Sequence, residues 1–185
     1  MTLQPRFTAH HTDERSSGTS RRAFIRLASL AAGVAAFGLT LPIGRAQASA
    51  TEALLLSCMD YRLIDDMVRY MDGRGLTDKY DHVVLAGASL GALTDKYPAW
   101  GRTFFEHVEV AISLHRIKKL MVIDHRDCGA YKVILGPDST KDPDAERAAH
   151  QAQLFALREV LNGKHPGLEV ELLLMALDGA VEAIG

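Results

Sequence analysis

Residues 52–73 have the sequence EALLLSCMDYRLIDDMVRYMDG, in which a strand-like run precedes a helix-like one. Residues 52–57 are nearly all apolar, as expected for a strand that is buried on both faces of a sheet. From Tyr61 to Gly73 the apolar residues recur with the spacing of one helical stripe, and Gly73 ends that pattern. The stretch therefore predicts a strand followed directly by a helix.

The same alternation continues along the rest of the chain. We expect further strands at residues 82–86, 119–124 and 169–175, and helices at residues 98–116, from 129 onward, and from 142 to about 163. Strands that alternate with helices predict an α/β fold, with a three-layer, open and mainly parallel sheet flanked by helices on both faces. Residues 137–141 are expected to form a loop, and residues 178–185 a small-residue segment without a regular element.

Length, composition and charge limit the classes of protein to be considered. The chain has 185 residues, of which 48% are hydrophobic, so it can bury one core of useful size. Its formal net charge of −2 lacks the excess of basic residues that nucleic-acid binding requires. We therefore expect no nucleic-acid partner.

The amino-terminal region has the features of an export signal. Residues 20–26, SRRAFIR, resemble a twin-arginine motif, and an apolar run (27–44) and a small-residue segment (46–50) follow it. We assign residues 1–48 to a cleaved signal peptide and residues 49–185 to one folded domain, periplasmic and without stable membrane association after cleavage. An uncleaved anchor is the alternative, because the apolar run is just long enough to span a bilayer.

Three side chains with metal-binding chemistry follow two of the expected strands. Cys58 comes after the first strand, and His125 and Cys128 come after the third. Functional groups of open parallel sheets gather beyond the carboxyl ends of strands, where the strand order reverses. Two thiolates and one imidazole suit Zn²⁺ and leave a fourth position for water or a carboxylate. A Cys58–Cys128 disulfide is the alternative, since oxidising compartments favour pairing.

Asp60 and Arg62 lie two residues apart on the turn that leaves the first strand. With Arg62 free, Asp60 would become a fourth zinc ligand and close the site. With the two side chains paired, Asp60 would be held aside and water could bind, with its pKa lowered to about 7. An ordinary surface ion pair is the alternative interpretation, which the neighbouring Cys58 makes less attractive.

Cys58-x-Asp60-x-Arg62 followed by His125-x-x-Cys128-Gly129 resembles the zinc signature of the β-carbonic anhydrases. The resemblance is strong over residues 54–132 and weaker beyond. It implies a zinc lyase, a carbonate dehydratase, in which zinc-bound hydroxide attacks CO2 to give bicarbonate. Asp60 and Arg62 would form the dyad that keeps the fourth zinc position open, and the chain would assemble as a homodimer or higher homo-oligomer.

Residues 86–93, AGASLGAL, depart from the family pattern, which has an Arg-Asn-Ala-Gly-Asn segment at this place. Two other functions therefore remain open: hydrolysis of carbon disulfide or carbonyl sulfide on the same scaffold, and a catalytically silent zinc protein in which Asp60 permanently fills the fourth position. A redox role for the two cysteines is disfavoured, because they form no C-x-x-C pair.

The remaining histidines and aromatic residues are expected to be structural. We interpret four histidines as surface or cap residues rather than ligands: His82, His107, His115 and His150. Tyr61 and Tyr131 flank the two motifs, where they could line a pocket, although ordinary packing also explains tyrosines that follow strands.

Overall fold

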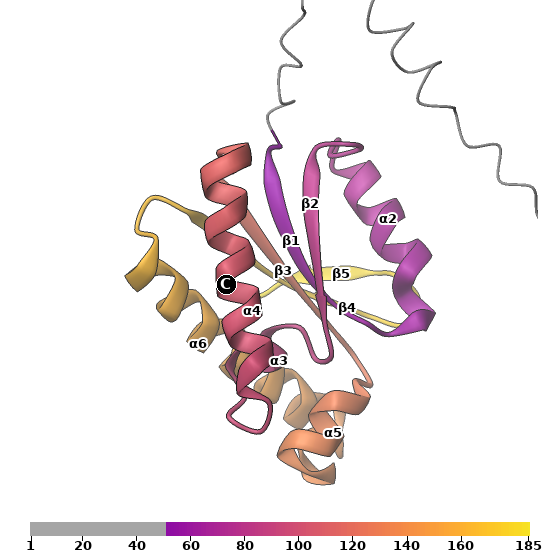
Figure 1. Ribbon diagram of the computed structural model, residues 1–185. Helices are drawn as coiled ribbons and strands as arrows, with labels where there is room; N and C mark the ends of the chain where they lie inside the picture. The colour runs from indigo at the N-terminus through magenta and orange to yellow at the C-terminus, as the bar shows by residue number, and fades with distance from the viewer. Residues whose placement is uncertain (1–50) are drawn as a thin grey trace, which may run out of the picture. The chain divides into compact units, whose positions relative to one another are not determined.

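The structure, a computed structural model, describes residues 51–185. In this range five strands form one sheet in the order β2-β1-β3-β4-β5 (Figure 1). Their bounds are β1 Ala53–Cys58, β2 Tyr80–Leu85, β3 Lys119–His125, β4 Glu169–Met175 and β5 Val181–Ala183. The first four strands are parallel to their neighbours, and β5 pairs antiparallel with β4.

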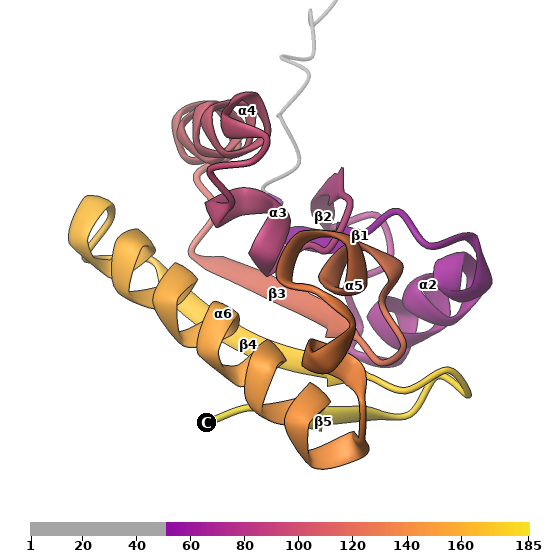
Figure 2. The same cartoon turned by 90° about the horizontal axis from the view of Figure 1, so that it is seen from below.

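Helices cover both faces of the sheet, which confirms the expected three-layer α/β architecture. Figure 2 shows α2 on one face and α3, α4 and α6 on the other. The helices are α2 Ile64–Gly73, α3 Ser89–Leu93, α4 Pro98–Val110, α5 Gly129–Leu135 and α6 Pro143–Lys164. Short 3-10 turns precede α2 (Tyr61–Leu63) and α6 (Pro137–Thr140), and a π-helical turn extends α4 (Ala111–His115).

Alternate residues of each central strand enter different cores, as the pleat of a sheet requires. From β1, Leu54 and Leu56 pack toward α4 and α6, whereas Leu55 packs toward Met67 and Met71 of α2. All of these side chains are almost completely buried. This two-sided burial explains why the first strand reads as a continuous apolar run.

The strand order reverses beside β1, which lies between β2 and β3. The chain passes from β1 to β2 on one side and then crosses back to β3 on the other side. The register pairs Ser57 with Ile123, so the carboxyl ends of β1 and β3 lie next to each other. The sheet thus brings the 58–62 and 125–129 segments to one edge, as the sequence predicted.

The sequence-based boundaries need several corrections. Helix α3 occupies 89–93 and strand β5 lies within 178–185, where neither element was expected. Both are short and depend on tertiary contacts: β5 pairs with β4, and Ile184 beside it is buried. Cys58 and His125 are the last residues of β1 and β3 rather than the residues after them.

The expected twin-arginine motif, apolar run and cleavage segment lie outside residues 51–185, so their assignment stays a prediction. Among the described residues, no helix is both long and apolar enough to cross a membrane.

Candidate metal centre

Cys58, His125 and Cys128 come together at the carboxyl edge of the sheet. One ligand atom from each of these residues lies within 4.8 Å of the other two. Cys58 ends β1, His125 ends β3, and Cys128 is the N-cap residue of α5. Two cysteine sulfurs and one imidazole at this separation form a donor set suited to Zn²⁺.

The hydrogen bond of His125 leaves its other ring nitrogen ready for a metal. Nδ1 lies 2.8 Å from the carbonyl oxygen of Arg126, which can only accept, so Nδ1 carries the proton. Nε2 is buried and has no hydrogen-bond partner within residues 51–185. A backbone carbonyl that fixes the imidazole tautomer in this way is the usual support of a histidine ligand.

The two cysteines influence each other's ionisation. Their sulfurs are 4.0 Å apart, and the backbone N–H of Gly87 donates to the Cys58 sulfur at 3.3 Å. The hydrogen bond from Cys128 lowers the pKa of Cys58 to about 4, with Gly87 as a further donor. The pKa of Cys128 is raised, because it holds its proton toward the Cys58 thiolate and is itself buried. A dication between the sulfurs would let both ionise, so the residues present fit zinc.

Asp60 lies beside the three candidate ligands but is bound by Arg62. The guanidinium donates from Nε and Nη2 to the two carboxylate oxygens of Asp60, at 2.9 and 2.8 Å. These bonds lower the pKa of Asp60 to about 2. Asp60 Oδ2 is 3.8 Å from Nε2 of His125. The paired arrangement of the two alternatives is therefore the one present.

Two pockets meet at Cys58 and Asp60. The first, of about 280 Å³, lies between α2 and β2, and its lining includes Met67, His82 and His125. The second, of about 380 Å³, lies on the α4 and α5 side, and its lining includes Ala86, Trp100 and Ile134. Their walls are mainly apolar, which suits small uncharged molecules.

Sequence reasoning placed one histidine incorrectly. His150, expected at the surface or at a cap, is fully buried, and its Nδ1 lies 2.9 Å from Asp124. His82 is exposed on β2, as expected, and its Nε2 lies 2.7 Å from the Ser57 hydroxyl in the wall of the first pocket. Period-2 alternation put Ser57 and His82 on one face, and that signal could have suggested their contact.

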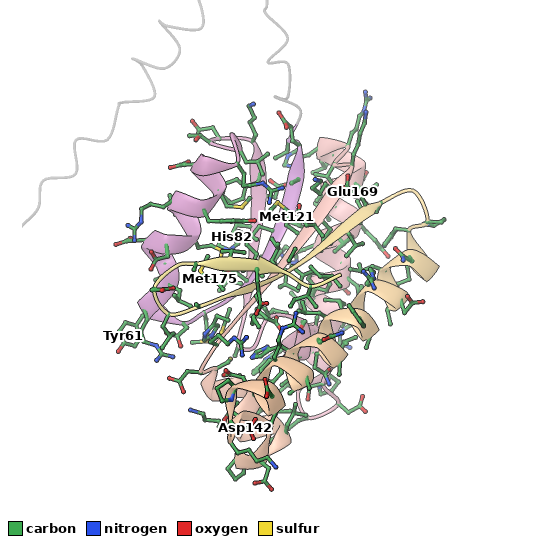
Figure 3. The ribbon with its side chains drawn as sticks, turned by 180° about the vertical axis from the view of Figure 1, so that it is seen from behind. Tyr61, His82, Met121, Asp142, Glu169 and Met175 are labelled. Atoms are coloured by element: carbon green, nitrogen blue, oxygen red, sulfur yellow. The ribbon has the colours of Figure 1, made fainter. Side chains whose placement is uncertain are left out.

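The remaining histidines and tyrosines of interest lie away from the candidate ligands or pack beside them. His115 bonds to Asp81 at 2.6 Å, and His107 bonds to a backbone carbonyl of its own helix. Tyr61 is 82% exposed and projects outward from the 3-10 turn (Figure 3). Tyr131 is completely buried.

Comparison with known proteins adds sequence and fold relationships. A family model described as "Putative carbonic anhydrase" matches residues 48–184. An uncharacterised protein of Rickettsia conorii (strain ATCC VR-613 / Malish 7) is 45% identical over 131 residues, which cover 71% of this chain and 70% of that protein. An uncharacterised protein of Rickettsia bellii (strain RML369-C) is 41% identical over 131 residues, which cover 71% and 80%.

Solved structures of similar fold include the carbonic anhydrase from Streptococcus mutans, with a TM-score of 0.50, 16% identity, and coverage of 90% of this chain and 98% of that one. A structure from a study of two tetrameric beta-carbonic anhydrases of Sordaria macrospora has a TM-score of 0.50, 15% identity, and coverage of 90% and 98%. At these identities the likeness is one of fold.

Proposed function

The chain belongs to the carbonic anhydrase family whose model spans residues 48–184, and from this membership we propose that it is a zinc-dependent β-class enzyme that hydrates CO2 to bicarbonate. One observation carries the proposal: three candidate zinc ligands converge beside an aspartate that an arginine holds aside. Cys58, His125 and Cys128 would hold Zn²⁺ through Sγ, Nε2 and Sγ. When bound, zinc supplies the acidity that makes water a nucleophile near neutral pH.

Asp60 would act as a hydrogen-bond acceptor beside the reacting water. Arg62 holds the Asp60 carboxylate and lowers its pKa to about 2, so the carboxylate stays ionised across neutral pH and is a weak base. Such a group orients a water molecule without removing its proton. The role of Arg62 is to keep Asp60 in this position and out of the coordination sphere.

The pockets would admit CO2. CO2 is small, uncharged and apolar, and both cavities that meet at the centre have mainly apolar walls.

Carbon disulfide or carbonyl sulfide is a second candidate substrate. Ala86, Trp100 and Ile134 all line the 380 Å³ pocket, and Ala86 begins the segment that departs from the family pattern. A wall of this kind also suits linear molecules that carry sulfur. Assays in which each gas competes with CO2 would identify the preferred substrate.

The decisive experiment is stopped-flow CO2 hydration by zinc-quantified protein from about pH 6 to about pH 9, with Cys58→Ser as control. A rate that rises with pH and is lost in the control supports the proposal. If the protein binds about one zinc per chain but turns over neither CO2 nor the sulfur-containing gases, it is instead a silent zinc protein.

We also propose that the folded domain works in the periplasm as a homo-oligomer. The export motif at residues 20–26 supports the location. Strand β2 supports the assembly, because it is an edge strand of the sheet and presents the exposed Val84 beside the first pocket.

A further inference from the structure

A buried polar cluster lies directly behind the metal centre, centred on Asp124 of β3. Its carboxylate accepts from the Ser89 backbone N–H at 3.0 Å, from the Ser89 hydroxyl at 2.6 Å and from the Tyr131 hydroxyl at 2.6 Å. His150 Nδ1 lies 2.9 Å from the same carboxylate. All four residues are at least 99% buried. A carboxylate is retained in such a place only when it is fully hydrogen-bonded.

The cluster joins four elements around the candidate ligands. Asp124 precedes His125 on β3, Ser89 begins α3, and His150 belongs to α6. Tyr131 lies on α5, which starts at Cys128. Burial and the Asp124 charge raise the pKa of Tyr131, so its hydroxyl remains a donor.

The contact with Ser89 fixes a turn that touches Cys58. Gly87 and Ala88 both have positive φ angles, 79° and 39°, and such a backbone is unfavourable for alanine. The bonds from Ser89 to Asp124 hold the carboxyl side of this turn. On its amino side, the Gly87 N–H donates to the Cys58 sulfur. A shift of Asp124 would therefore move the turn, and with it the N–H group that donates to the Cys58 sulfur.

The contact with Tyr131 fixes the helix that begins at the other cysteine. Cys128 is the N-cap residue of α5, and Tyr131 lies in the first turn of the same helix. The Tyr131 hydroxyl is anchored on Asp124, so this contact holds the first turn of α5 and with it Cys128.

We propose that Asp124 is a positioning residue of the metal centre, which holds the Gly87–Ser89 turn and the start of α5 so that Cys58 keeps its backbone donor and Cys128 keeps its place beside Cys58. This inference rests on the zinc site of the proposed function, but it does not depend on CO2 turnover. Asp124 with Ser89 supports residues 86–93, the segment that departs from the family pattern.

The test compares the zinc affinity of the full-length protein and two variants, by competition with a chelator. The asparagine side chain of Asp124→Asn has the shape of aspartate, but its NH2 group would face the Ser89 and Tyr131 groups that donate to the carboxylate. Partners that orient metal ligands typically contribute about 10- to 100-fold to affinity, so we expect a loss of that size. Ser89→Ala removes one of the bonds and should cause a smaller loss. The sulfur-to-metal absorption band of the Co²⁺-substituted variants should shift as well.

Leu157→Ala is the matched control, because Leu157 is fully buried in α6 but belongs to no polar contact of the cluster. It should lower the melting temperature while leaving zinc affinity within about twofold of wild type. If Asp124→Asn and Ser89→Ala bind zinc as tightly as wild type, or lose no more than Leu157→Ala, the proposal is overturned. Wild-type protein that binds zinc without hydrating CO2 would overturn the proposed function and leave this inference intact.

Discussion

Arg62 binds Asp60 through two parallel hydrogen bonds, from Nε to Oδ1 at 2.9 Å and from Nη2 to Oδ2 at 2.8 Å. The same guanidinium donates from Nη1 to Asp127 Oδ2 at 2.8 Å. Arg62 thus joins the segment after β1 to the segment after β3. Because the pair is partly exposed, its main effect is on orientation rather than on stability.

Removing Arg62 should separate zinc binding from catalysis. In Arg62→Ala, Asp60 becomes free to approach the metal, so zinc content should stay near one per chain while kcat/KM for CO2 falls by about 10- to 100-fold. Metal analysis and stopped-flow hydration on the same samples measure both quantities.

Arg69→Ala is the control for this prediction, since Arg69 forms an exposed ion pair with Asp66 on α2, away from the candidate ligands. Its activity should equal that of wild type. Undiminished activity of Arg62→Ala would contradict the assigned role of the pair.

Zinc should protect the two cysteines from oxidation. Their sulfurs are 4.0 Å apart, so a small movement brings them to bonding distance once the metal is removed. A mild oxidant should form the Cys58–Cys128 disulfide in chelator-treated protein and leave the zinc-loaded protein reduced. Mass spectrometry after alkylation counts the free thiols. Equal oxidation rates with and without zinc would argue against both sulfurs being ligands.

The sheet and the ligand cluster could be predicted from the sequence because both depend on local signals. The apolar run ending at Cys58 and the one ending at His125 each identify a buried strand, and parallel strands place their ends at one edge. The order of the strands beside β1 follows from the usual topology of such sheets.

The support of the site could not be predicted, because it depends on contacts between distant segments. Asp124 and His150 are 26 residues apart, and nothing in the sequence near either residue indicates their contact. The turn at Gly87 and Ala88 gave no signal either, since alanine rarely adopts a positive φ. Strand β5 exists only through its pairing with β4.

One ion pair should make stability depend on pH in a defined direction. Arg74 donates to both oxygens of Glu171, at 2.8 and 3.1 Å, and lowers the pKa of Glu171 from its ordinary value of 4.5. The folded state therefore binds the proton less tightly than the unfolded state. The resulting stabilisation is complete above about pH 4.5 and is lost as the pH falls through the folded-state pKa.

Glu171→Gln should accordingly lower the free energy of unfolding by roughly 0.5–1 kcal/mol at neutral pH. The difference from wild type should shrink as the pH falls below the ordinary glutamate pKa. Urea titrations at several pH values measure it, and the exposed Glu159→Gln on α6 serves as control. A difference that grows toward acid pH would contradict the sign.

The export proposal predicts a dependence on the arginine pair in residues 20–26. Replacing Arg21 and Arg22 together with lysine should leave the full-length chain in the cytoplasm, because twin-arginine signals are read as a pair. The wild-type chain should appear in the periplasm with an amino terminus near residue 49. Cell fractionation with amino-terminal sequencing measures both, and Arg26→Lys should export normally. Retention of an uncleaved wild-type chain in the membrane would favour the anchor.

The proposed assembly predicts that the exposed edge of β2 is an interface. Val84 is 47% exposed on this strand, and Met59, Ile64 and Val68 nearby are 65%, 59% and 46% exposed. An edge strand also carries unpaired backbone N–H and C=O groups, and a charged side chain on such an edge blocks pairing with another chain.

Val84→Glu should therefore yield monomers at protein concentrations where wild type is a dimer or larger, as measured by light scattering after gel filtration. Val160→Glu on α6, where Val160 is 37% exposed, should keep the wild-type mass. Because Val84 also lines the first pocket, the monomeric variant should lose CO2 hydration while retaining zinc. A wild-type protein that is monomeric at all concentrations would rule out this interface.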